Sequence, residues 1–156
     1  MRVLQPLLTE GTQGGMKHDL SADLRRERRA VLRLYSASFM SNTKWRSVFT
    51  ALENDGLGIR QLVIKFIEAE NEKAISLPWL NAPHAFVDSI DFGPFPLVGI
   101  EWMEVPAVAI FPRKNNVPAE HYPQDIAAVR SALLALGRKL PLEDTSTGLR
   151  IVGHAR

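Results

Sequence analysis

Apolar residues at helical spacing predict a helix that begins shortly after residue 40. Its buried face follows the i, i+3, i+4, i+7 pattern and comprises Trp45, Val48, Phe49 and Leu52. Asn42 or Thr43 can cap the first turn, because a short polar side chain accepts a free backbone N–H there. Gly56 can end the helix. We therefore expect one helix with a single buried face in this region.

Alternating apolar and polar positions predict strands in the middle of the chain. Residues 59–67 place Leu62, Ile64 and Phe66 on one side of an extended segment and Val63, Lys65 and Ile67 on the other. A turn at Asn71 leads to a partner strand at residues 73–77, which makes a hairpin. Further apolar runs predict strands at residues 97–105, 107–111 and 149–152. In the first of these runs, Val98, Ile100 and Trp102 should face one way, and Glu101 and Met103 the other.

The clearest helical pattern lies near the C-terminus. Its apolar residues repeat at three- to four-residue spacing and are Ile126, Val129, Leu133, Leu136 and Leu140. Pro123 suits the first position of this helix. Residues 78–96 hold four prolines and should be mostly irregular, with one helical turn at residues 85–90. Because the order α-β-β-β-β-α-β does not alternate, we predict an α+β fold with a single antiparallel or mixed sheet of about five strands against two main helices.

Residues 1–39 differ from the rest of the chain. A glycine-rich stretch at residues 11–15 precedes a basic run at residues 25–29. Ser21 can cap a helix that reaches about Tyr35, but its apolar stripe is too sparse to demand burial. We predict an N-terminal extension, flexible or partly helical, before a single α+β domain at residues 40–156. The fold should then survive removal of residues 1–39; a basic arm that binds nucleic acid is the alternative.

The composition is that of a globular protein and excludes several classes of site. The chain has 156 residues, 46% hydrophobic and 23% charged. It contains no cysteine, which excludes disulfides, thiolate zinc sites, iron–sulfur clusters and a cysteine nucleophile. No apolar run approaches the ~20 residues that cross a bilayer. We therefore expect a soluble cytoplasmic protein without a membrane partner.

Charge is unevenly distributed, although the formal net charge is only +2. Residues 66–104 carry seven acidic side chains and one basic side chain. An acidic surface attracts a partner with a basic surface and speeds its association, whereas so small a net charge disfavours nucleic acid. Trp79, in a loop bounded by prolines, is either an exposed anchor or a lid over the core. We predict partner-binding residues at Trp79, Glu70, Glu72, Asp88 and Asp91.

Motifs of the common catalytic mechanisms are missing from the sequence. There is no phosphate-binding loop, dinucleotide fingerprint, Gly-x-Ser-x-Gly elbow or His-Glu-x-x-His pair, and we expect no catalytic residue, metal or cofactor. His84 and His121 with a nearby carboxylate could hold Zn or Fe, which is the alternative. Glu101 lies in a strand that should be buried and needs a partner; we favour a salt bridge with Arg60 or Lys65 over a catalytic acid with a raised pKa.

Two short motifs carry a resemblance to a known family. The tetrapeptide Asn42-Thr43-Lys44-Trp45 and the segment Gly99-Ile100-Glu101-Trp102-Met103-Glu104-Val105 resemble a family of small bacterial proteins of unknown function with an Asn-Thr-Lys-Trp start and an Ile-Glu-Trp strand. The resemblance covers residues 40 to about 105 and implies that Met40 corresponds to the family's first residue. It implies no activity, catalytic residue or cofactor.

These observations favour a non-enzymatic protein-binding module over an enzyme. The small size, the acidic centre and the missing catalytic motifs suit an inhibitor of the immunity-protein or antitoxin kind, with a basic partner protein. The alternative is a small metal-dependent or acid/base hydrolase that uses His84, His121 and nearby carboxylates.

Overall fold

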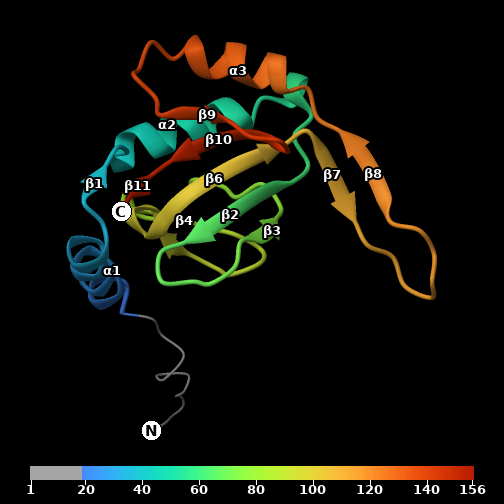
Figure 1. Ribbon diagram of the computed structural model, residues 1–156. Coiled ribbons are helices and arrows are strands. Elements are labelled where there is room, and N and C mark those ends of the chain that lie inside the picture. Colours follow the sequence, from blue (N-terminus) through green and yellow to red (C-terminus); the bar gives the residue numbers. More distant parts are fainter. Residues whose placement is uncertain (1–18) are drawn as a thin grey trace, which may run out of the picture.

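Five antiparallel strands form the main sheet, in the order β3-β2-β6-β10-β9. The computed structural model describes residues 19–156 and has an α+β fold, as predicted (Figure 1). The strands of this sheet are β3 (Lys73–Ile75), β2 (Leu62–Phe66), β6 (Ile100–Pro106), β10 (Gly148–Val152) and β9 (Leu142–Asp144). The predicted strand at residues 149–152 is thus confirmed, whereas β9 was not anticipated.

Two helices, α2 (Asn42–Leu52) and α3 (Ile126–Leu134), pack on one face of this sheet (Figure 1). Ser41 caps α2 by accepting the Lys44 N–H at 3.1 Å, so the predicted caps Asn42 and Thr43 are wrong by one and two residues. Asp125 caps α3 in the same way, at 3.0 Å from the Ala128 N–H. The predicted helix start at Pro123 is wrong, because Pro123 is the last residue of a strand.

The core lies between these helices and the sheet. Trp45 and Phe49 of α2 and Leu133 of α3 are at most 1% exposed, and each such side chain stabilises the fold by roughly 2–3 kcal/mol. Strand register aligns Ile64, Met103 and Ile151 across the sheet, and all three are fully buried. Met103 therefore faces the helices and Trp102 faces away from them, because alternate residues of a strand point to opposite faces.

The predicted facing of Trp102 was wrong. The sequence pattern placed Trp102 on the same side of the strand as Ile100, but Ile100 is fully buried and Trp102 is only half-buried. The ladder between β2 and β6 shifts register between Lys65 and Phe66, so alternation is interrupted at Glu101. A short 3-10 helix, η2 (Leu97–Gly99), also replaces the first part of the predicted strand.

A two-stranded ribbon projects from one end of the main sheet (Figure 1). It consists of β7 (Val108–Phe111) and β8 (Glu120–Pro123). The run at residues 107–111 correctly predicted β7, but its partner β8 was not predicted. Two smaller ladders pair β4 (Phe86–Val87) with β5 (Phe95–Pro96), and β1 (Ala37–Ser38) with β11 (His154–Ala155). The predicted helical turn at residues 85–90 is therefore wrong.

The segment before residue 40 contains a helix that contacts the rest of the fold. Helix α1 (Leu20–Leu34) ends where predicted, at about Tyr35, but its N-cap is Asp19 and not the predicted Ser21, which lies in the first turn. Its stripe is not solvated, since Ala30, Val31 and Tyr35 form a buried cluster with Ile67. The strand β1 also pairs with β11, so both α1 and β1 contact segments beyond residue 40. The glycine-rich stretch at residues 11–15, which belongs to the predicted extension, lies outside the described residues. Elsewhere in the described residues, a 3-10 helix, η1 (Asp55–Leu57), follows α2.

Candidate binding surface on the open face of the sheet

Strand register aligns five side chains in a row on the sheet face opposite α2 and α3, here called the open face. The row runs through Ala74, Val63, Glu104, Arg150 and Glu143, each paired with the next. Directly opposite residues of antiparallel strands share a face and lie close together. The row therefore places an acidic, a basic and a second acidic side chain side by side on β6, β10 and β9.

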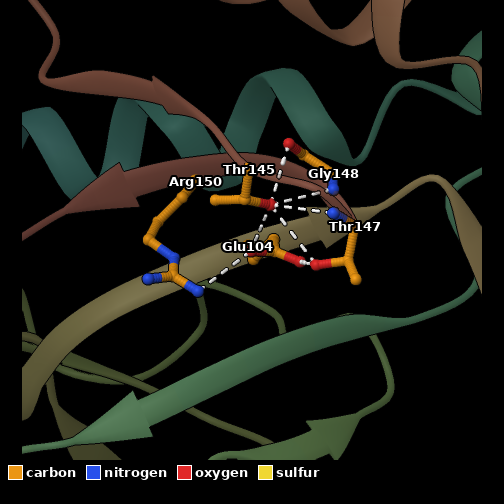
Figure 2. Close-up of polar contacts among 5 residues, drawn as sticks. All are labelled: Glu104, Thr145, Thr147, Gly148 and Arg150. Carbon is orange, nitrogen blue, oxygen red and sulfur yellow. Dashed lines mark hydrogen bonds and ion pairs between the residues drawn. The ribbon is translucent and has the colours of Figure 1, made fainter.

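Glu104 is held in a network at the centre of the open face (Figure 2). Its carboxylate is 4% exposed and accepts hydrogen bonds from Thr145 Oγ1 at 3.0 Å, Thr147 Oγ1 at 2.5 Å and Arg150 Nη2 at 3.2 Å. A buried carboxylate is tolerated when it is paired and hydrogen-bonded, as here. Thr145 and Thr147 lie in the turn that ends at Gly148. This position requires glycine, because a Cβ there would lie 2.2 Å from the Val105 carbonyl oxygen.

Arg150 joins this network to an aromatic surface. Its guanidinium carbon lies 3.7 Å from the ring centre of Trp102, which is a cation–π contact. Its Nε is buried and has no hydrogen-bond partner among residues 19–156, while Nη2 donates to Glu104. The Arg150 side chain is 27% exposed, so the stacked pair remains accessible from the open face.

A hollow of about 560 Å³ lies over the open face beside this network. Its apolar walls come from the sheet and from the base of the ribbon, and are Val63, Ala74, Pro106, Ala107, Val108 and Ile110. Trp102 adds an aromatic surface, and the polar lining is Gln61, Glu72, Glu104, Ser146, Thr147 and Arg150. Mostly apolar walls with a few placed polar groups are typical of binding sites, and sites of this kind span roughly 300–1,000 Å³.

Two buried glutamines fix the ribbon over the hollow. The Gln61 amide pairs with the Ile110 backbone, donating to its carbonyl at 2.8 Å and accepting its N–H at 3.0 Å. The Gln124 side chain accepts the N–H groups of Arg60 and Gln61 and donates to the carbonyls of Gln61 and Pro106. Both glutamines are at most 7% exposed, so a buried hydrogen-bond network, and not a flexible hinge, attaches the ribbon to the sheet.

A second polar cluster lies at the end of β6 near α1. Glu101 Oε1 accepts hydrogen bonds from Lys65 Nζ at 3.0 Å and Tyr35 Oη at 2.5 Å. Burial raises the pKa of Glu101, but the hydrogen bonds from Tyr35 and Lys65 and the positive charges of Lys65 and Arg156 together bring its pKa below the usual value. Burial and the bond to Glu101 raise the pKa of Tyr35 to about 12. The predicted bridge to Lys65 is confirmed; Arg60 instead stacks on Tyr122, and the raised pKa of a catalytic acid is not observed.

The predicted partner-binding residues lie in two places. Glu70 and Glu72 are exposed before β3, and Glu72 lines the hollow. Asp88 and Asp91 instead accept backbone N–H groups, from Ser89 at 2.9 Å and Ser76 at 3.2 Å. Trp79 is half-buried and its backbone bridges to Asp88, so it is neither a fully exposed anchor nor a core residue.

The two candidate metal ligands lie on different elements. His84 is beside the start of α2, with Nε2 at 3.5 Å from Thr43 Oγ1, and His121 is on β8 opposite Ile110. Among residues 19–156, no group of three or more His, Cys, Asp or Glu side chains is arranged to hold a metal ion. Within that same range, no helix has the length and apolar character to span a membrane.

Comparisons with protein-family models, curated proteins and solved structures found no match to this chain. The resemblance to small bacterial proteins therefore stays a prediction, and function is inferred from the site itself. Sequence reasoning missed Arg150, Thr147 and Gln61. The one signal for Arg150 was a charged residue between two core positions, Leu149 and Ile151, which is the pattern of a strand with a solvent-facing side.

Proposed function

We propose that this chain is a non-enzymatic protein-binding module, and that it binds a partner bearing basic and apolar side chains on the open face of its sheet. The observation that carries the proposal is the hollow of about 560 Å³, which combines apolar walls with the acidic rim residue Glu72. Apolar walls accept the aliphatic stem of a lysine or arginine, and a carboxylate at the rim accepts its charged head.

Electrostatics of the open face support a basic partner. The face carries three carboxylates and one guanidinium, which belong to Glu72, Glu104, Glu143 and Arg150. The charge of Lys65 is neutralised by its salt bridge with Glu101. The hydrogen bonds around Glu104 hold the surface in one geometry, which lowers the entropy lost on binding. Binding rather than catalysis is favoured, because both Glu104 oxygens are already engaged by protein donors.

The two predicted sets of acids differ in how well they suit this role. Glu70 and Glu72 are both exposed before β3 and Glu72 lines the hollow, so these are the acidic residues that we expect to contact the partner. Asp88 accepts the N–H of its neighbour Ser89, and Asp91 accepts the N–H of Ser76 just after β3, which favours a structural role for both. A toxin with a basic cleft, as bound by immunity proteins, would have the required chemistry.

Titration with a short acetylated peptide of alternating lysine and leucine tests the proposal. We expect the indole N–H signal of Trp102 to shift in the NMR spectrum, and that of Trp45 to stay fixed, because Trp45 is 1% exposed in the core. Glu72→Lys should weaken binding about tenfold. The matched control Glu53→Lys, an exposed acid that follows α2 on the other face, should bind as the wild type. Unchanged Trp102 signals would refute the proposed surface.

A further inference from the structure

The loop at the tip of the ribbon is basic and apolar, which complements the acidic rim and the apolar walls of the hollow. Residues 112–119 contain Arg113 and Lys114 and no acidic residue, and Val117 in the same loop is 43% exposed. The loop has a defined shape, since Arg113 Nε donates to the Pro118 carbonyl at 2.9 Å and Asn115 and Asn116 both adopt positive φ. A basic and apolar tip is therefore presented at the far end of the ribbon.

The hollow lies along the part of the ribbon nearest the sheet. Val108 and Ile110 of β7 line the hollow, and the tip begins after Phe111. At about 3.3 Å per residue, the middle of the tip lies roughly 20 Å from Val108, too far to fold back into its own hollow while β7 and β8 stay paired. The ribbon also cannot swing freely, because Gln61 and Gln124 fix its base.

We propose that two copies of this chain pair through a twofold axis across their ribbons, so that the basic tip of each ribbon occupies the hollow of the other copy. A twofold axis perpendicular to the middle of the ribbon brings the tip of one copy to the hollow of the second and, at the same time, the second tip to the first hollow. The inference rests on the proposed function, because it assigns an occupant to the same open face.

Charge and apolar surface match in this arrangement. Lys114 of one copy meets the acidic rim at Glu72 of the other, and Val117 meets the exposed ribbon-base residues Val108 and Ile110, which are 41% and 46% exposed. The contact closes on itself, so it produces a dimer rather than a filament. Since the contact is partly electrostatic, the dimer should weaken as salt is raised.

Charge-swap complementation tests the pairing on the full chain by sedimentation equilibrium. Lys114→Glu alone places like charges at both contacts of a dimer, and so does Glu72→Lys alone; each variant should dimerise at least about tenfold more weakly than the wild type. An equimolar mixture of the two variants should restore dimers. At one contact the two substituted positions then face each other with opposite charges, and at the other contact the wild-type pair of Lys114 and Glu72 forms. Lys139→Glu, an exposed cation after α3, is the matched control and should dimerise as the wild type.

The outcomes separate this inference from the proposed function. A monomeric wild type, a dimer indifferent to both single variants, a mixture that stays monomeric, or a ladder of larger species would each overturn the twofold exchange. A monomer whose Trp102 signal still responds to the basic peptide would leave the proposed function standing without the dimer. Loss of both responses would overturn both.

Discussion

Replacing Gln124 by alanine should detach the ribbon from the sheet. The Gln124 amide uses its full capacity of two donated and two accepted hydrogen bonds, at 2.8 to 3.1 Å, and is 6% exposed. Truncation leaves the N–H groups of Arg60 and Gln61 and the carbonyls of Gln61 and Pro106 without this partner. Each buried polar group left unsatisfied costs about 1–3 kcal/mol, and water that enters the site will bond to some of these four groups. We therefore expect the free energy of unfolding to fall by about 3–5 kcal/mol.

Urea unfolding followed by tryptophan fluorescence measures this loss. Gln124→Glu is the matched variant, because it keeps the oxygen that accepts the N–H groups of Arg60 and Gln61 but points a second carboxylate oxygen at the two carbonyls. It should be nearly as destabilising at pH 7 and less so when the acid is protonated. Gln61→Ala removes the two bonds to Ile110, and its effect should not add to that of Gln124→Ala, since both belong to one network. A loss below about 1 kcal/mol for Gln124→Ala would show that the network does not hold the ribbon.

Three further expectations concern the tryptophans, the cluster around Glu101 and the N-terminal segment. Trp45→Ala should cost about 3–5 kcal/mol in urea unfolding, and Trp102→Ala clearly less, because only Trp45 lies in the core; equal losses would contradict the assigned facing. Folding lowers the pKa of Glu101, so its contribution to stability is present above the unfolded pKa and disappears as the pH falls through the folded value; melts from pH 6 to 3 should show a shallower decline for Glu101→Gln. Deleting residues 1–39 should lower the melting temperature by more than about 4 °C in calorimetry, because Val31 and Tyr35 are buried against Ile67.

Local patterns predicted the helices and most strands of the main sheet. The buried stripe of α2 and the core positions of β10 are dictated by periodicity within one segment, so the sequence was sufficient for them. The ribbon strand β8 was missed because Pro123 suits a helix start as well as a strand end. The burial of α1 was missed because a stripe of three apolar residues does not by itself predict a buried face, and the residue that covers it, Ile67, is distant in the sequence.

The candidate site depended on information that no single segment carries. Glu104, Arg150 and Glu143 become neighbours through register, and a shift of one residue would send every side chain of the moved strand to the other face. The bulge at Lys65 and Phe66 is such a local irregularity: it interrupts the alternation of side chains at Glu101, which bonds to Lys65 and not to the network around Glu104. Residue type alone could not distinguish these two acids of the same strand: Glu101 holds α1 through Tyr35, while Glu104 sits under the hollow.

The orientation of Trp102 connects the structural and functional interpretations. If Trp102 faced the helices, the core would gain a large aromatic side chain and the open face would lose the surface on which Arg150 stacks. Stacking on the Trp102 indole restricts the rotamers of the Arg150 guanidinium before any partner binds. Without that ring, Arg150 would still bond to Glu104, but its position would not be fixed. The arrangement that places Trp102 outside the core therefore sacrifices some apolar burial and gains a preorganised acidic surface. Such a trade of stability for a fixed polar surface is expected where a protein binds another molecule.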